Sequence, residues 1–325
     1  MYKVIEQLAY TANNYSPRLA AMKVITSAFN SMGKRLNKYP TFPYRYAANL
    51  VEKQLASRYQ GFLDEWKTNH SSETAHTFSS KVRIPIWTCW LQDLSTMPPL
   101  LQHTTHLQQI MSCDYDFRLI SYSNIHNYLD FPGYIMDKLH SGVITPVHFT
   151  DLIRVSLLEE YGGVWLDATV LPVRTLPNSL FQTPFYTIKS PKFTFASSNK
   201  YPEINRWEGY FIAGQPHALL YKWMKDFLFE YWKKENFLIH YLMINQAALL
   251  GIDYIPLIRS EYDALHQDNH SVELLGNALD THQYTTLDDY TSDGTYVFKL
   301  SRHTDYRPQD LRDIYAQIAQ HMKLK

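Results

Sequence analysis

The spacing of apolar residues divides the chain into an N-terminal helical segment and a longer part in which strands and helices alternate. In the first part, apolar positions recur three and four residues apart, which predicts helices over 4–14, 18–36 and 46–69. The polar run HSSETAHTFSSK at 70–81 then indicates a linker. We therefore predict a helical extension over residues 1–78 and a second domain over residues 79–325.

Strand-like and helix-like runs follow one another in the second domain. The predicted strands, which are rich in β-branched and aromatic residues, cover 83–90, 116–122, 163–167, 185–190, 209–214 and 296–301. The predicted helices follow Pro98-Pro99, lie around 124–141, begin at Thr145-Pro146, cover 217–235 and 237–250, and start again near Pro308. This alternation is typical of an α/β sheet with crossover helices.

Composition supports a globular cytoplasmic protein without a general affinity for nucleic acid. The 325 residues are 45% hydrophobic and 19% charged, and Lys+Arg and Asp+Glu balance at 31 each. No run reaches the roughly 20 apolar residues that cross a bilayer, and the N-terminus lacks the apolar core of a signal peptide. Cys89 and Cys113, without metal-ligand spacing, indicate free thiols in a reducing compartment.

Charge is unevenly distributed near the N-terminus. Between residues 1 and 38, Glu6 is the only acidic residue. The basic residues there are Lys3, Arg18, Lys23, Lys34, Arg35 and Lys38. This excess favours either peripheral contact with an anionic membrane surface, on the inner face of the membrane, or an ordinary solvated face of a helical pair.

A single carboxylate ends the predicted strand at 163–167. In EEYGGVWLDATV, residues 159–170, two glycines interrupt a helix and a short β-prone run finishes on Asp167. Ligands of open α/β sheets gather outside the carboxyl ends of the strands, so Asp167 is placed to reach a metal or a hydroxyl. The alternative is that Asp167 caps the turn that follows it.

The preceding helix carries charged residues in apolar surroundings. His148, Asp151 and Arg154 are three residues apart and share one side of a helix that is otherwise mostly apolar from Val147 to Leu158. Burying charges without partners is costly, so a ligand site is favoured over a plain ion pair. The planar guanidinium of Arg suits a pyrophosphate, and an Asp accepts hydrogen bonds from sugar hydroxyls.

The stretch HFTDLIRVSLLEEYGGVWLDATVLP, residues 148–172, resembles the signature of the capsular polysaccharide synthesis family of glycosyltransferases, which is similar to glycosyltransferase family 32 and other DxD-type enzymes. The resemblance is sharp over 83–175, looser to about 301, and does not extend to residues 1–78. It implies a GT-A fold, a Rossmann-like mixed sheet flanked by helices that binds a nucleotide sugar. It also implies a divalent metal, Mn²⁺ or Mg²⁺.

The resemblance assigns roles residue by residue. The catalytic residues would be Asp151, Arg154 and Asp167. The donor would contact Trp87, Asp151, Arg154, Gly163, Asp167, Thr169 and Lys299, with Trp87 at the base. The metal would be held by Asp167 and His303, while Lys299 or Arg302 would neutralise phosphate charge. Trp207 and Glu208 would line the acceptor side.

The implied function is transfer of a hexose from a nucleoside diphosphate sugar, with UDP as the expected nucleotide, to a saccharide or lipid-linked glycan in cell-surface polysaccharide synthesis, with retention of configuration. Two departures from the family pattern support an alternative. Thr169 replaces the second aspartate of the DxD motif, and no acidic residue stands near His240. The alternative is a silent nucleotide-sugar-binding or scaffold subunit. A hydrolase would need a second carboxylate beside Asp167, which the strand end lacks.

Overall fold

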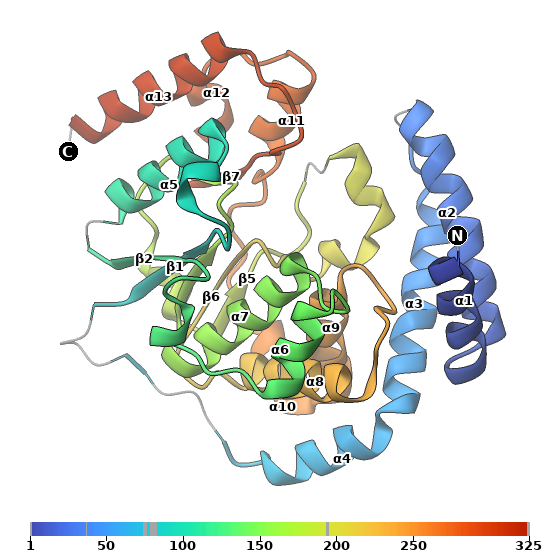
Figure 1. The fold of residues 1–325 in the computed structure, drawn as a ribbon. Coiled ribbons are helices and arrows are strands. Elements are labelled where there is room, and N and C mark those ends of the chain that lie inside the picture. The colour runs from blue at the N-terminus through green and yellow to red at the C-terminus, as the bar shows by residue number, and fades with distance from the viewer. Residues whose placement is uncertain are drawn as a thin grey trace.

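A five-stranded mixed sheet forms the centre of the protein in a computed structural model, which describes residues 2–36, 38–73, 77–78, 83–112, 114–192 and 195–323 (Figure 1). The strand order is β2-β1-β3-β6-β5. The strands are β1 Pro85–Cys89, β2 Asp116–Ile120, β3 Gly163–Leu166, β5 Phe185–Thr187 and β6 Phe211–Gly214. β1 runs parallel to β2 and β3, whereas β6 pairs antiparallel with both β3 and β5. The predicted mixed α/β sheet is confirmed.

Both faces of the central strands β3 and β6 are buried, which explains why these two strands are continuously apolar. In β3, Val164 and Leu166 point into one apolar cluster and Trp165 points into another. The Trp165 side is covered by helices α7 Pro146–Tyr161, α8 Leu219–Lys234 and α9 Met243–Tyr254. Pro85 is the first residue of β1, the position at which a strand tolerates proline.

A second, two-stranded sheet lies at the carboxyl end of β3. Its strands are β4 Val170–Pro172 and β7 Val297–Lys299, paired antiparallel with Val170 opposite Lys299. Beside it pack α5 Pro99–Met111, α11 Leu274–Asp280, α12 Leu287–Thr291 and α13 Pro308–Lys323. The patterns predicted β7, α5 and α13, but they missed β4, α11 and α12, which are each only three to seven residues long.

Four helices precede the sheet in the part of the chain that the structure describes. They are α1 Tyr2–Asn14, α2 Pro17–Leu36, α3 Thr41–Arg58 and α4 Gln60–Asn69. The pattern predicted one helix over 46–69, but the chain leaves helical geometry at Tyr59, whose buried ring packs against Phe227 and Tyr231. Val51, Leu55 and Leu63 belong to the same apolar cluster as α7–α9. The boundary near residue 78 stays a prediction, and part of the expected 70–81 linker lies outside the described residues, as does Cys113.

The remaining helices are short. They are α6 Gly133–His140, α10 Pro256–Asp263, and the 3-10 turns η1 Leu94–Thr96, η2 Ile125–Asn127, η3 Asn178–Phe181, η4 Ala196–Lys200 and η5 Pro202–Asn205. The helix predicted at 237–250 begins later, at Met243. None of the helices in the part of the chain that the structure describes combines the length and the apolar character that crossing a membrane requires.

Candidate functional site

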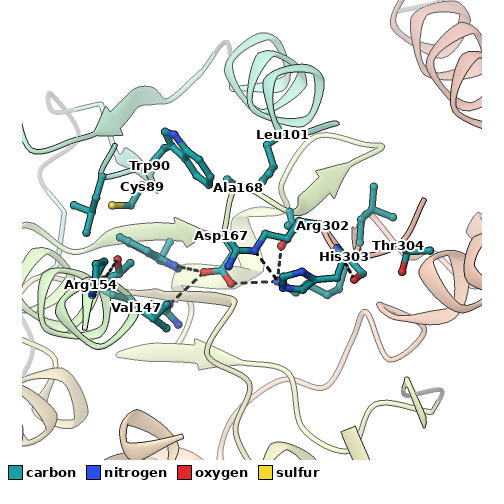
Figure 2. A pocket seen from close by; sticks show the side chains of 18 of the residues that line it. Cys89, Trp90, Leu101, Val147, Arg154, Asp167, Ala168, Arg302, His303 and Thr304 are labelled. Carbon is teal, nitrogen blue, oxygen red and sulfur yellow. Dashed lines mark hydrogen bonds and ion pairs between the residues drawn. The ribbon is translucent and has the colours of Figure 1, made fainter. Parts of the chain in front are cut away.

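A cavity of about 510 Å³ opens beyond the carboxyl ends of β1 and β3 (Figure 2). Its walls come from residues 89–92 at the end of β1 and just beyond it, the first half of α7, residues 167–169 after β3, and residues 299–304 from the end of β7 onward. Figure 2 shows Asp167 between Arg154 on one side and Arg302 and His303 on the other. Segments far apart in the sequence therefore meet at the edge where α/β sheets bind ligands.

The turn after β3 directs the Asp167 carboxylate into this cavity. The backbone N–H of Asp167 donates to Tyr210 O at 2.9 Å, and its carbonyl accepts from the N–H of Val170 at 2.8 Å. The carboxylate accepts a hydrogen bond from Trp165 Nε1 at 2.9 Å. Among the described residues, the partners of this carboxylate are all side chains, so the alternative interpretation, a cap on the following turn, does not describe it.

Arg154 is fixed from four directions and is almost fully buried. One guanidinium nitrogen, Nη2, lies 3.5 Å from Asp151 Oδ1 and 3.3 Å from Asp167 Oδ1. The other, Nη1, donates to the carbonyl of Gly209. The guanidinium also lies over the Trp165 ring, 4.9 Å from its centroid. A surface ion pair would have none of this support, so Arg154 is a preorganised buried cation.

Lys299, which follows Asp167 by 132 residues in the chain, supplies a second cation. Its Nζ lies 3.2 Å from Asp167 Oδ2 and donates to the Thr169 hydroxyl. The ammonium also lies 4.9 Å from the centre of the Tyr210 ring. The register of β4 with β7 creates this arrangement, because Val170 stands opposite Lys299.

The two aspartates beside Arg154 titrate differently. Burial alone would raise the pKa of Asp167, but Lys299 and Arg154 outweigh that effect and hold it below the ordinary value. Burial raises the pKa of Asp151 from 3.8 to about 7, and Arg154 offsets only part of the increase. Asp167 is therefore an anion throughout the physiological range, whereas Asp151 can also donate a hydrogen bond.

A second cavity, of about 290 Å³, shares a wall with the first. The shared wall consists of Val147, Arg154, Asp167, Phe195, Tyr241 and Lys299. Three carboxylates with raised pKa values also line this second cavity: Asp151, Glu208 and Glu273. Burial and the neighbouring Glu273 place the pKa of Glu208 well above its ordinary value, and burial raises that of Glu273 to about 7.

Glu208 has further capacity for hydrogen bonding. Its Oε1 is buried and has no hydrogen-bond partner among the residues that the structure describes. Leaving such an atom unpaired is costly, so a polar group that enters the cavity would be held there. Asn245 also lines this cavity.

Three of the predicted site residues lie outside both cavities. Trp87 is buried in the core, and its indole N–H donates to Gly162 O at 2.9 Å. Trp207 is also fully buried. Gly163 has a φ of +101°, and a Cβ on it would lie 2.2 Å from the carbonyl oxygen of Pro85. Gly163 and Trp207 are packed within the core, whereas Trp87 also lines a separate cavity of about 380 Å³.

Sequence reasoning missed several lining residues. Trp90, three positions after Trp87, lines the larger cavity, and Tyr241 lies in the shared wall. The acidic partner expected near His240 comes from a different segment, because Glu203 Oε1 lies 3.2 Å from His240 Nε2. No local motif marks Glu203 or Glu273, since each approaches the site through the tertiary fold.

The residues expected to hold a divalent metal do not fit that role in this arrangement. The Asp167 carboxylate and the Thr169 hydroxyl both contact the same Lys299 ammonium. His303 is exposed, and its Nε2 accepts from Arg302 Nε at 3.3 Å. Within the described residues, no group of three or more His, Cys, Asp or Glu side chains is arranged to hold a metal ion. The metal stays a prediction of the resemblance.

A family model described as capsular polysaccharide synthesis protein matches residues 36–318. The chain therefore belongs to the capsular polysaccharide synthesis protein family. Because the match starts at residue 36, the limit placed on the resemblance at residue 79 was wrong. The physical reason is that α3 and α4 contribute to the main core.

Two curated relatives are named as O-glycosyltransferases. The chain is 23% identical to O-glycosyltransferase PaGT of Phomopsis amygdali over 169 residues, which are 48% of this chain and 41% of the relative. It is 29% identical to O-glycosyltransferase braB of Annulohypoxylon truncatum over 105 residues, 30% of this chain and 24% of the relative. The chain thus spans less than half the length of either.

Among solved structures, the chain is similar to the PaToxG glycosyltransferase. The alignment covers 85% of this chain and 97% of that one at 11% identity, with a TM-score of 0.40. A similarity at this level does not show a common fold.

Proposed function

We propose that the protein is a glycosyltransferase of the GT-A type, which moves a hexose from a nucleoside diphosphate donor, with UDP as the expected nucleotide, to a saccharide or lipid-linked glycan in cell-surface polysaccharide synthesis. The single observation that carries the proposal is the convergence of Arg154, Asp167 and Lys299 at the wall between two cavities. Family membership and the names of the curated relatives support the same class.

The larger cavity would receive the nucleoside diphosphate. Its aromatic residue near the carboxyl end of β1, Trp90, offers a face for the base, a role first assigned to Trp87. Arg154 and Lys299, which are pre-placed at the shared wall, would bind the diphosphate oxygens. As the glycosidic bond breaks, negative charge grows on the departing diphosphate, and these fixed cations would stabilise it without reorganising.

The smaller cavity would receive the hexose. Carboxylates are the usual partners of sugar hydroxyls, and Asp151, Glu208 and Glu273 line this cavity. Glu208 therefore serves the transferred sugar in this proposal rather than the acceptor side. We name no nucleophile, and retention of configuration remains an expectation from the family.

Charge neutralisation by Lys299 replaces the expected metal in this proposal. The resemblance predicts a divalent ion on Asp167 and His303, but the ammonium of Lys299 already contacts the Asp167 carboxylate and the Thr169 hydroxyl. A lysine fixed in this way supplies the positive charge that a metal would bring to the diphosphate. No step of the proposed reaction passes through a metal ion.

The direct test is sugar transfer by purified protein with UDP-hexoses, comparing the wild type with Asp167→Asn and Arg154→Ala. We expect each variant to lose about 100-fold or more of the transfer rate, as removal of one preorganised charge commonly does. Arg45→Ala, at an exposed position on α3, is the matched control. Release of UDP, followed together with product mass, provides the measurement.

The outcomes of this test are distinct. Binding of a nucleotide sugar, seen as a raised melting temperature, without any transfer or donor hydrolysis would establish the silent-subunit alternative. Full transfer by a folded Asp167→Asn protein would remove Asp167 from the mechanism.

A further inference from the structure

The outer side of the N-terminal helices exposes an unusual number of large apolar residues. Of the fourteen large hydrophobic side chains that are exposed among the described residues, seven lie within residues 4–42. They are Val4, Ile5, Val24, Ile25, Met32, Leu36 and Phe42. Single exposed apolar residues need no explanation, but a concentration of this kind marks an interaction surface.

The spacing on α2 places these residues on one face. Ala21, Val24, Ile25, Ala28, Met32 and Leu36 are all exposed, and they follow one another at steps of three or four residues apart from the adjacent pair. On its other side α2 buries Leu19, Ala20 and Gly33. The helix is therefore apolar on two faces, and only one of them is covered by the rest of the protein.

The position of the helix leaves this second face open. α2 packs on α1 and α3, and Figure 1 shows α1 and α2 on the outer side of α3, away from the central sheet. Phe42, at the start of α3, is 79% exposed and follows the end of α2 in the chain. We define the outer face of α2 together with Phe42 as the α2 face.

Basic residues border the α2 face. Residues 1–51 contain seven Lys and Arg side chains but only one acidic residue, Glu6, although the whole chain is electrically balanced. Lys34, Arg35 and Lys38 are exposed around Leu36, where α2 ends. Charge of one sign is therefore segregated to the segment that exposes the apolar residues.

We propose that the α2 face docks on an anionic membrane surface. Apolar side chains flanked by Lys and Arg on a helix that lies parallel to a bilayer gain both from insertion at the headgroup boundary and from attraction to anionic lipids. A second copy of this chain is disfavoured as the occupant, because it would bring the same excess of positive charge to the interface. The proposal does not depend on the proposed sugar transfer.

Sedimentation of the full-length protein with lipid vesicles tests the proposal. We expect the wild type to pellet with vesicles of phosphatidylcholine mixed with phosphatidylglycerol, to remain in solution with phosphatidylcholine alone, and to be released by about 0.5 M salt, which screens surface charge. Two variants separate the contribution of apolar insertion from that of electrostatic attraction. Ile25→Ser/Met32→Ser/Leu36→Ser removes apolar contacts, and Lys34→Gln/Arg35→Gln/Lys38→Gln removes charge.

Matched controls change the same residue types elsewhere. Ile110→Ser/Leu257→Ser removes exposed apolar residues from α5 and α10, and Lys233→Gln/Arg312→Gln removes exposed charges from α8 and α13. We expect each α2-face variant to bind about tenfold or more weakly, and each control to bind like the wild type. Unchanged far-ultraviolet circular dichroism and melting temperature ensure that the comparison concerns folded proteins.

Three results would overturn the proposal. The first is a wild type that does not pellet with anionic vesicles. The second is binding that neither α2-face variant weakens. The third is a wild type that light scattering shows to be a dimer in solution, together with a monomeric Ile25→Ser/Met32→Ser/Leu36→Ser variant, because the α2 face would then bind a second copy of the chain.

Discussion

Single residues at this site combine opposing electrostatic effects. Asp167 is ionised because Lys299 and Arg154 outweigh its burial, whereas Asp151, beside the same guanidinium, has a pKa of about 7. Arg154 cannot fully compensate two buried carboxylates, since its Nη2 is shared between them. A site that holds such groups for a ligand sacrifices stability when the ligand is absent.

Asp151→Asn should stabilise the protein at alkaline pH and reduce transfer. Folding raises the pKa of Asp151 from 3.8 to about 7, so the folded state binds more protons in that interval and the free energy of unfolding falls as pH rises through it. The asparagine removes this loss. Urea unfolding should show a gain on the order of a few kcal/mol near pH 8 and little difference near pH 4. Equal curves for the two proteins at both pH values would contradict the assignment.

The substitution Gly163→Ala tests whether Gly163 is required for packing of the sheet. Alanine there must adopt a φ of +101° and place its Cβ 2.2 Å from Pro85 O, so we expect Gly163→Ala to lower the free energy of unfolding by about 2–5 kcal/mol. Gly61, on α4, has no atom within 4 Å of an added Cβ, so Gly61→Ala should be neutral or stabilising by up to about 1 kcal/mol. A well-folded Gly163→Ala protein with weakened donor affinity alone would restore the donor-binding role.

At the scale of elements, the pairing of β4 with β7 delivers the cation that the proposed chemistry needs. β4 follows Asp167 by three residues, and β7 ends on Lys299. The sequence predicted β7 and singled out Lys299, but β4 has only three residues and gives no recognisable period. The site is therefore assembled by a strand pair of which only one member was predictable.

Lys299→Met should abolish transfer, while removal of metal ions should not. If the ammonium neutralises the diphosphate, we expect a loss of about 100-fold or more for Lys299→Met and a change within about twofold after treatment of the wild type with a chelator. Lys53→Met, at an exposed position on α3, is the control. Initial rates of UDP release measure the effect. Activity that disappears with the chelator and returns with Mn²⁺ would restore the metal assignment.

The sequence predicted those site contacts that join residues close to one another in the chain, and it missed those that depend on the tertiary fold. Asp151 and Arg154 are one helical turn apart and Asp167 directly follows the next strand, so periodicity and strand order were enough to bring them together. Trp87 and Trp90 both lie near the end of β1, and only the direction of each side chain decides which one lines the cavity. Glu203 and Glu273 were not predictable, because Glu203 lies in the short 3-10 turn η5 and Glu273 directly precedes the short helix α11, and neither segment has a recognisable period.

At the scale of the whole molecule, one buried carboxylate connects the N-terminal helices to the domain that contains the sheet. Glu235, directly after α8, is fully buried. It accepts hydrogen bonds from Tyr10 on α1, from Tyr15 at 2.8 Å and from Arg58 Nε on α3 at 2.7 Å. These contacts attach the helices that carry the α2 face to the end of α8, and therefore to the core of the protein.

Removal of this carboxylate should loosen the N-terminal helices more than it disturbs the sheet. Glu235→Ala removes an acceptor from Arg58 and from three tyrosines, Tyr10, Tyr15 and Tyr59. We expect a loss of about 2–3 kcal/mol, below the 3–5 kcal/mol of a fully buried pair because Arg58 is partly exposed. Glu230→Ala, which removes a partly exposed pair with Lys234 on α8, should cost no more than about 0.5 kcal/mol. Urea unfolding measures both losses, and hydrogen exchange should show faster exchange in α1 and α2 for Glu235→Ala alone. Equal exchange in these helices for the two variants would mean that apolar packing, and not this carboxylate, holds them in place.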